Sequence, residues 1–128
     1  MSEKIKYEME FPIQASSALL YQYISTPSGM QEWYADNVNS RGEFFNFIWE
    51  GSEEVAKLIS KQKGKSIRFQ WMEDEGTNYY FEMRIDLDDI TKDVCIMVTD
   101  FAEEDEVDEG KMLWENMISE LKHLLGSV

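Results

Sequence analysis

The C-terminal end of the chain carries apolar residues at the spacing of an amphipathic helix. These residues fall on one helical stripe: Val107, Trp114, Met117, Ile118, Leu121, Leu124 and Leu125. Polar residues fall on the opposite side: Asp108, Glu115, Ser119 and Lys122. Because a stripe of this kind buries one helical face, the pattern predicts a single long helix that closes the chain.

Upstream of this helix the apolar period changes to two, which is typical of strands with one buried face. Residues 4–11 alternate, and we expect Pro12 to end that strand because proline has no N–H for a ladder. Six further strands are expected from Asn37 onwards, the last five at residues 45–49, 54–61, 67–71, 79–87 and 91–101. Short turns separate them, so consecutive strands should pair as antiparallel hairpins.

Two short helices are predicted between the first strand and the others. Ser16 or Ser17 supplies an N-cap for the first of them. Its apolar residues follow at helical spacing: Ala18, Leu19, Leu20, Tyr23 and Ile24. Thr26-Pro27 opens the second helix, which should run to about Trp33-Tyr34, since proline is favoured at an early helical position. The order of elements predicts one α+β domain over residues 1–128.

Composition narrows the classes of partner. The chain has 128 residues, of which 43% are apolar, enough for one core. Asp and Glu number 26 against 12 Lys and Arg, a formal charge of -14. Such a chain is repelled by phosphate backbones and by anionic lipid surfaces, so we expect no nucleic-acid binding and no membrane insertion. A basic protein partner remains compatible with this charge.

The sequence favours a cytoplasmic location. No apolar run approaches the length of a membrane span, and residues 1–5 show no apolar signal-peptide core. The single cysteine, Cys95, lies in the apolar run 94–98, which predicts a buried, reduced thiol.

Four short motifs in this order resemble the START-like, helix-grip superfamily (SRPBCC), which includes the birch pollen allergen. They are Ser25-Thr26-Pro27 leading to Trp33, the Phe-x-Phe-x-Trp-x-Gly of residues 45–51, Ile67-Arg68-Phe69-Gln70-Trp71, and Trp114-x-x-Met117 to Leu121-x-x-Leu124. The nearest branch is similar to the homologues of the activator of the heat-shock-protein-ninety ATPase.

The resemblance implies a curved seven-stranded antiparallel sheet wrapped around the long C-terminal helix, with two short helices after the first strand. It also implies a cavity between the sheet and that helix. Members of the superfamily bind lipids, sterols, polyketides and other apolar molecules, and some are cyclases or aromatases. Eukaryotic chaperone activators carry an additional N-terminal domain for which these 128 residues have no room, so an ATPase-activating role is not expected.

The candidate ligand-binding residues are aromatic or soft apolar side chains on predicted inward faces, together with one glycine. They are Trp33, Phe45, Phe47, Trp49, Phe69, Trp71, Phe81, Met83, Gly110 and Trp114. Such side chains suit an apolar ligand, but an ordinary packed core uses the same types, so both interpretations stay open. Gly110 either permits close approach of a ligand or strand, or lies in the loop before a helix that begins near Lys111.

The sequence gives little sign of a metal or cofactor site. A dense acidic run precedes the last helix: Glu103, Glu104, Asp105, Glu106, Asp108 and Glu109. It lacks the spacing and central glycine of a calcium loop, and acids at a helix N-terminus offset the macrodipole. His123 is the only histidine and projects away from the apolar stripe. One histidine and one cysteine do not build a usual transition-metal site, so we expect no metal and no cofactor.

Three functions compete at this stage. The first is binding of an apolar or amphipathic, lipid-like small molecule, and the second is a protein-interaction or co-chaperone-like role without a ligand. The third is a cyclase or aromatase, for which Asp36 or Glu82 could act as acid or base, although nothing singles out either one. Surface positions are expected for Arg41, Arg84 and Tyr80, each of which could otherwise supply a polar contact in a pocket.

Overall fold

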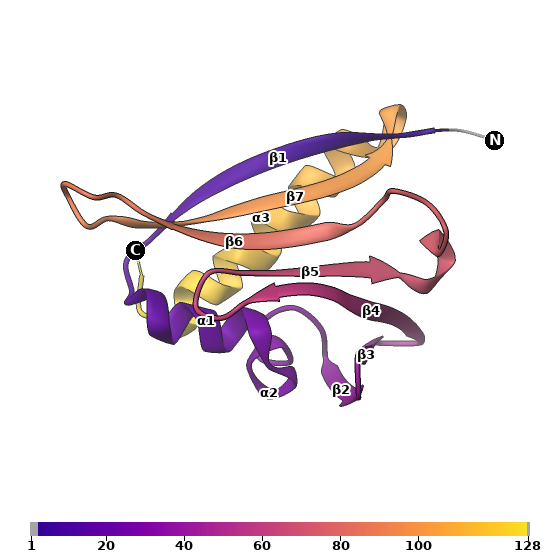
Figure 1. Ribbon diagram of the computed structural model, residues 1–128, viewed down its shortest axis with the longest axis horizontal. Coiled ribbons are helices and arrows are strands. Elements are labelled where there is room, and N and C mark those ends of the chain that lie inside the picture. The colour runs from indigo at the N-terminus through magenta and orange to yellow at the C-terminus, as the bar shows by residue number, and fades with distance from the viewer. Residues whose placement is uncertain (1–2, 128) are drawn as a thin grey trace.

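One antiparallel sheet organises the protein in the computed structural model, which describes residues 3–127 (Figure 1). Its seven strands are β1 (Lys4–Ile13), β2 (Asn37–Arg41), β3 (Phe44–Trp49), β4 (Ser52–Gln62), β5 (Ser66–Trp71), β6 (Phe81–Leu87) and β7 (Val94–Glu103). They lie in the order β1-β7-β6-β5-β4-β3-β2. Strands β2 to β7 therefore pair with their neighbours in the chain, and β1 closes the sheet on β7. The predicted seven-stranded sheet is confirmed.

Within the described residues, three α-helices accompany the sheet: α1 (Ser17–Ser25), α2 (Pro27–Met30) and α3 (Val107–Leu124). Short 3-10 turns, η1 (Met72–Asp74) and η2 (Glu104–Glu106), follow β5 and precede α3. The Ser16 hydroxyl accepts from the Leu19 N–H, and the Thr26 hydroxyl accepts from the Gly29 N–H, so each short helix has a side-chain N-cap. The long helix α3 crosses one face of the curved sheet, which confirms the helix-grip α+β fold (Figure 1).

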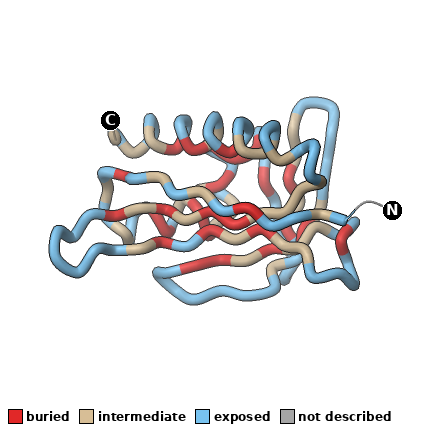
Figure 2. The backbone as a smooth tube through the Cα atoms, turned by 90° about the horizontal axis from the view of Figure 1, so that it is seen from above, coloured by how far each residue is buried: buried red, intermediate tan, exposed pale blue. Residues whose placement is uncertain are grey.

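The apolar stripe of α3 faces the sheet (Figure 2). Trp114, Ile118 and Leu121 are buried, whereas Leu124 is 43% exposed. The prediction that Leu124 belongs to the buried stripe is therefore wrong. At about 100° per residue Leu124 projects well to the side of Leu125, which packs against the core instead. No helix among residues 3–127 has the length and apolar character needed to cross a membrane.

Several predicted boundaries differ from the structure: β6 begins at Phe81 and not at residue 79, and β7 covers Val94–Glu103 and not residues 91–101. Strand β1 continues through Pro12, which lies opposite Cys95. Because β1 is an edge strand, Pro12 can sit in it without removing a ladder hydrogen bond between strands. Helix α2 ends at Met30, and Trp33 and Tyr34 lie in the turns that follow, where their N–H groups both bond to the Met30 carbonyl.

The core lies between the concave sheet face and the helices. Five of the predicted inward residues are buried in it: Phe45, Phe47, Phe69, Phe81 and Met83. Tyr34 reaches their aromatic rings from the turn after α2, with ring centroids 5.1 Å from Phe47 and 5.9 Å from Phe81. The core thus fills one end of the space between sheet and α3 with rings.

Candidate functional site

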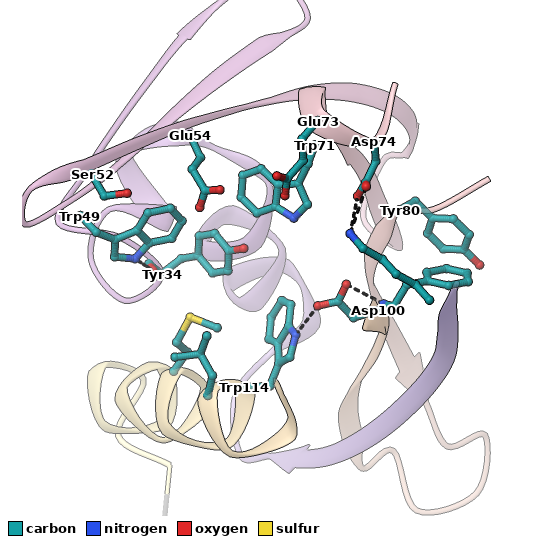
Figure 3. A pocket seen from close by; sticks show the side chains of 14 residues that line it. Tyr34, Trp49, Ser52, Glu54, Trp71, Glu73, Asp74, Tyr80, Asp100 and Trp114 are labelled. Carbon is teal, nitrogen blue, oxygen red and sulfur yellow. Dashed lines mark hydrogen bonds and ion pairs between the residues drawn. The ribbon is translucent and has the colours of Figure 1, made fainter. Parts of the chain in front are cut away.

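At the end of the core where β7 runs into α3, the space between sheet and helix is not filled. A pocket of about 500 Å³ opens there (Figure 3). Its lining comes from both layers: Lys4, Tyr34, Trp49, Ser52, Glu54, Trp71, Glu73, Asp74, Tyr80, Asp100, Phe101, Leu113, Trp114 and Met117. Ser52, Glu54, Glu73 and Leu113 are exposed and mark its mouth. A volume of this size is in the range of small-molecule sites.

Aromatic rings form the inner wall of the pocket. Tyr34 is central, with ring centroids 5.8 Å from Trp49 and 5.7 Å from Trp114. Trp49 in turn lies 6.3 Å from Trp71. The Trp49 indole N–H donates to the Tyr34 carbonyl at 3.0 Å, which fixes the ring across β3 and the turn after α2. The wall is therefore built from rings that pack on one another, with Trp49 held by a hydrogen bond.

Asp100 supplies a carboxylate at the inner end of the pocket. Its Oδ2 accepts from the Trp114 indole N–H at 2.8 Å and from the Tyr7 hydroxyl at 3.4 Å, and its Oδ1 accepts from the Phe101 N–H at 2.7 Å. Burial raises the pKa of Asp100, and these three hydrogen bonds only partly oppose the effect. The carboxylate joins β1, β7 and α3, and its ionised form is disfavoured where it stands.

The Tyr34 hydroxyl is directed into the pocket (Figure 3). Tyr34 is only 5% exposed, and within residues 3–127 its hydroxyl makes no hydrogen bond. Every fully enclosed side-chain polar atom in that part of the chain has a hydrogen-bond partner. Because the Tyr34 hydroxyl has none, it is not fully enclosed, and the pocket is the route by which it is reached. Burial, followed by the charges of Asp100 and Glu54, holds the pKa of Tyr34 well above its ordinary value. The pocket therefore contains a neutral hydroxyl that is free to donate or accept.

The remaining polar lining is mostly acidic. Lys4 Nζ lies 3.0 Å from Asp74 Oδ1 across the mouth, and Asp74 is buried. Burial alone would lower the pKa of Lys4, but the hydrogen bond to Asp74 and the negative charge of Asp74 together have the larger effect and raise it. Glu54 and Glu73 complete the set. Four carboxylates and one ammonium group give the lining a formal charge of about -3.

The structure divides nine of the ten candidate ligand-binding residues into three groups. Trp49, Trp71 and Trp114 line the pocket. The core residues Phe45, Phe47, Phe69, Phe81 and Met83 lie in the packed layer and do not line it. Trp33 donates its indole N–H to the Tyr23 carbonyl at 2.8 Å and packs on Tyr34 from outside the pocket.

Gly110, the tenth candidate, lies inside α3 and not in a loop before it. A Cβ there would stand 2.5 Å from the Tyr7 hydroxyl oxygen. The close approach is therefore to a side chain of β1, one of the two alternatives that the sequence left open.

Sequence reasoning missed the polar half of the pocket. Asp100 continues the inward register of Val94, Ile96 and Val98 on β7, and this alternation was a usable signal. Glu54 likewise shares the register of Ala56, which is buried on β4. Lys4 and Asp74 are 70 positions apart, and no local pattern indicates their pairing.

The other singled-out residues lie mostly outside the pocket. Asp36 and Arg41 are exposed, Glu82 pairs with Arg68 at 2.8 Å, and Arg84 pairs with Asp86 at 3.2 Å. His123 is exposed on α3.

Tyr80 does line the pocket and stacks under the Arg68 guanidinium, 3.9 Å from its ring centroid. The prediction of a surface position for Tyr80 is therefore wrong.

Cys95 is half-buried and not fully buried as predicted, because it points to the opposite face of β7 from Val94 and Ile96.

Comparison with known proteins gives a family and several solved relatives. A family model described as the START-like superfamily domain matches residues 1–127. A solution structure from Bacteroides fragilis is 34% identical, with a TM-score of 0.68 and coverage of 97% of this chain and 92% of that one. No curated protein matches the chain.

Two more distant structures share the fold. The Aha1 dimer from Colwellia psychrerythraea is 17% identical, with a TM-score of 0.80 and coverage of 94% of this chain and 96% of that one. The protein XoxI from Bacillus cereus is 12% identical, with a TM-score of 0.78 and coverage of 94% of each chain. At such identities the likeness carries the fold alone.

Proposed function

The chain belongs to the START-like superfamily, and on that basis we propose that it binds a small apolar or amphipathic molecule in the pocket between the sheet and α3. The observation that carries the proposal is the Tyr34 hydroxyl. Tyr34 is a buried residue, but its hydroxyl is unpaired within residues 3–127 and is open to the pocket. A ligand that fills the pocket would close this hydroxyl off from water, and a polar group of that ligand would then supply the partner that a buried hydroxyl needs.

The aromatic wall supports an apolar body for that ligand. Trp49 and Trp71 are partly buried and pack against the core without being covered by it. Covering the remaining exposed ring surface would stabilise the complex by about 25 cal/mol per Å² of apolar area. Because these rings already pack on one another without a ligand, less side-chain ordering has to accompany binding.

The same geometry argues for binding and against catalysis by Asp100. Its two oxygens already accept three hydrogen bonds from Trp114, Tyr7 and Phe101. These donors hold the carboxylate as a structural link, so a role in proton transfer to a ligand is not proposed.

Native mass spectrometry of the purified protein tests whether a small molecule co-purifies. A thermal-shift panel of fatty acids, sterols, aromatic polyketides and their neutral or amine analogues should then raise Tm for at least one class. Mass action predicts about 2.7 kcal/mol of stabilisation at a hundredfold excess over Kd. Tryptophan emission should change as well, because three of the four tryptophans line the pocket.

Two adjacent leucine-sized residues on α3 provide a matched control. Leu113 and Met112 are 58% and 63% exposed, but only Leu113 lines the pocket. Leu113→Ala should weaken binding severalfold, whereas Met112→Ala should leave it unchanged. A panel without any shift, together with a crystal structure in which side chains fill the pocket, would favour the protein-interaction role instead.

A further inference from the structure

The pocket combines aromatic faces with an excess of negative charge. Lys4 is committed to Asp74 at 3.0 Å, and among residues 3–127 it is the one cationic side chain that lines the pocket. None of the ion pairs among residues 3–127 involves Glu54, Glu73 or Asp100. An anionic ligand would therefore meet two carboxylates without an ion-pair partner at the mouth, Glu54 and Glu73, and the hydrogen-bonded carboxyl group of Asp100 at the inner end.

A cation meets the opposite situation. Tyr34, Trp49, Trp71 and Trp114 line the pocket, and the face of an aromatic ring attracts positive charge through its quadrupole. The carboxylates of Glu54 and Glu73 add long-range attraction at the mouth. The Tyr34 hydroxyl oxygen, which lacks a partner in the described part of the chain, can accept a hydrogen bond from an ammonium N–H.

We propose that the pocket selects a protonated amine carried on an apolar or aromatic body, with the ammonium held by the Tyr34 hydroxyl and the acidic lining. This inference rests on the proposed function and names its ligand class. It also predicts that free fatty acids, whose head group is a carboxylate, bind poorly.

Three probes with one ring system test the charge preference. They are 1-naphthylmethylammonium, 1-naphthalenemethanol and 1-naphthoate, which are cationic, neutral and anionic at neutral pH. Calorimetric titration should give the ammonium at least about tenfold tighter binding than the carboxylate, and raising the salt concentration should narrow that ratio.

Variants of the residues that line the pocket separate the contribution of the Tyr34 hydroxyl to ammonium binding from that of the carboxylates at the mouth. Tyr34→Phe should weaken the ammonium probe about tenfold, because a hydrogen bond to a charged donor is lost. The double change Glu54→Gln with Glu73→Gln should weaken it about fivefold and leave the neutral probe unchanged. Asp89→Asn removes a similar charge from the exposed loop between β6 and β7 and should alter neither probe.

The outcomes distinguish this inference from the function on which it rests. If the neutral probe or another panel member binds while the ammonium has no advantage, the charge preference is wrong and ligand binding stands. If Asp89→Asn weakens the ammonium as much as the mouth variants do, the attraction comes from overall charge and the preference of the pocket is refuted. If no compound binds, both proposals fail.

Discussion

At the residue scale, the chemistry of Cys95 depends on the face of β7 to which it points. Its thiol donates to Glu10 Oε2 at 3.4 Å on the neighbouring strand β1. Burial, then this hydrogen bond and the charge of Glu10, raise the pKa of Cys95 to about 11. Since the thiolate is the nucleophile, we expect slow alkylation by iodoacetamide at neutral pH.

The rate of Cys95 alkylation against pH measures this directly. It should rise with a midpoint well above the ordinary value of 9.0. Glu10→Gln should lower that midpoint, because the hydrogen-bonded carboxylate is removed. A midpoint at or below 9.0 in the native protein would contradict the assignment.

Gly110 offers a second prediction at this scale. Alanine is favoured over glycine inside a helix by up to about 1 kcal/mol. Here, however, the added Cβ would stand 2.5 Å from the Tyr7 hydroxyl oxygen, and Tyr7 is buried. Overpacking of this kind costs about 1–3 kcal/mol, so Gly110→Ala should lower the free energy of unfolding.

Tyr7→Phe provides the matched background for that substitution. Without the hydroxyl, the nearest ring atom to the new Cβ is the Tyr7 Cζ position at 3.3 Å. Urea unfolding should therefore show a smaller cost for Gly110→Ala in Tyr7→Phe than in the wild type. Equal costs in both backgrounds would mean that the hydroxyl does not limit the approach of α3 to β1.

At the scale of elements, α3 closes the core through Trp114, Ile118 and Leu121, of which Trp114 has the largest side chain. This side chain is 3% exposed, packs on Tyr34 and Phe81, and donates its indole N–H to Asp100. Trp114→Ala should cost about 3–5 kcal/mol of unfolding free energy, as large-to-small core changes do. Trp114→Phe keeps a ring but removes the N–H, so it should cost less than alanine does. A loss below about 1 kcal/mol for alanine would mean that α3 does not close the core.

The elements themselves were predictable because each is specified by a local pattern. The α3 stripe and the alternation in β3, β5 and β6 indicate type, order and buried face from neighbouring residues alone. Boundaries were less predictable where tertiary context decides them. Pro12 is tolerated because β1 lies at the sheet edge, and that position depends on pairing with β7, the last strand of the chain.

The pocket was only half predictable for the same reason. Its tryptophans follow from alternation, since Trp49 and Trp71 extend the inward faces of β3 and β5. Its polar groups follow only in part: alternation puts Asp100 and Glu54 on the inward faces of β7 and β4, but no local pattern joins Lys4 to Asp74 across 70 positions. Tyr34 lies in a turn without periodicity, and its role arises only when β3, β6 and α3 surround it.

At the scale of the whole molecule, Asp100 connects β7 with α3 and β1, and its ionisation is therefore coupled to global stability. Burial raises its pKa in the folded protein above the ordinary value of 3.8. Between these two values the folded state binds more protons at this site than the unfolded state does. The contribution of Asp100 to stability is thus greatest at low pH and is lost as pH rises through the window.

Asp100→Asn removes this titration and should reverse the trend relative to the wild type. The amide cannot accept from all three donors of Asp100, so the variant starts with an unpaired N–H. As pH rises from 4 towards 7, the wild type becomes less stable at this site because it must bury the ionised carboxylate of Asp100, whereas the amide of the variant stays neutral. The free energy of unfolding of the variant, taken relative to that of the wild type, should therefore increase over this range. Urea unfolding at several pH values measures this difference between variant and wild type. Titration of the other carboxylates is common to both proteins and cancels, and Asp89→Asn serves as the control at an exposed position. A difference that falls with pH would mean that the ionised form of Asp100 is favoured by folding, contrary to its burial between the sheet and α3.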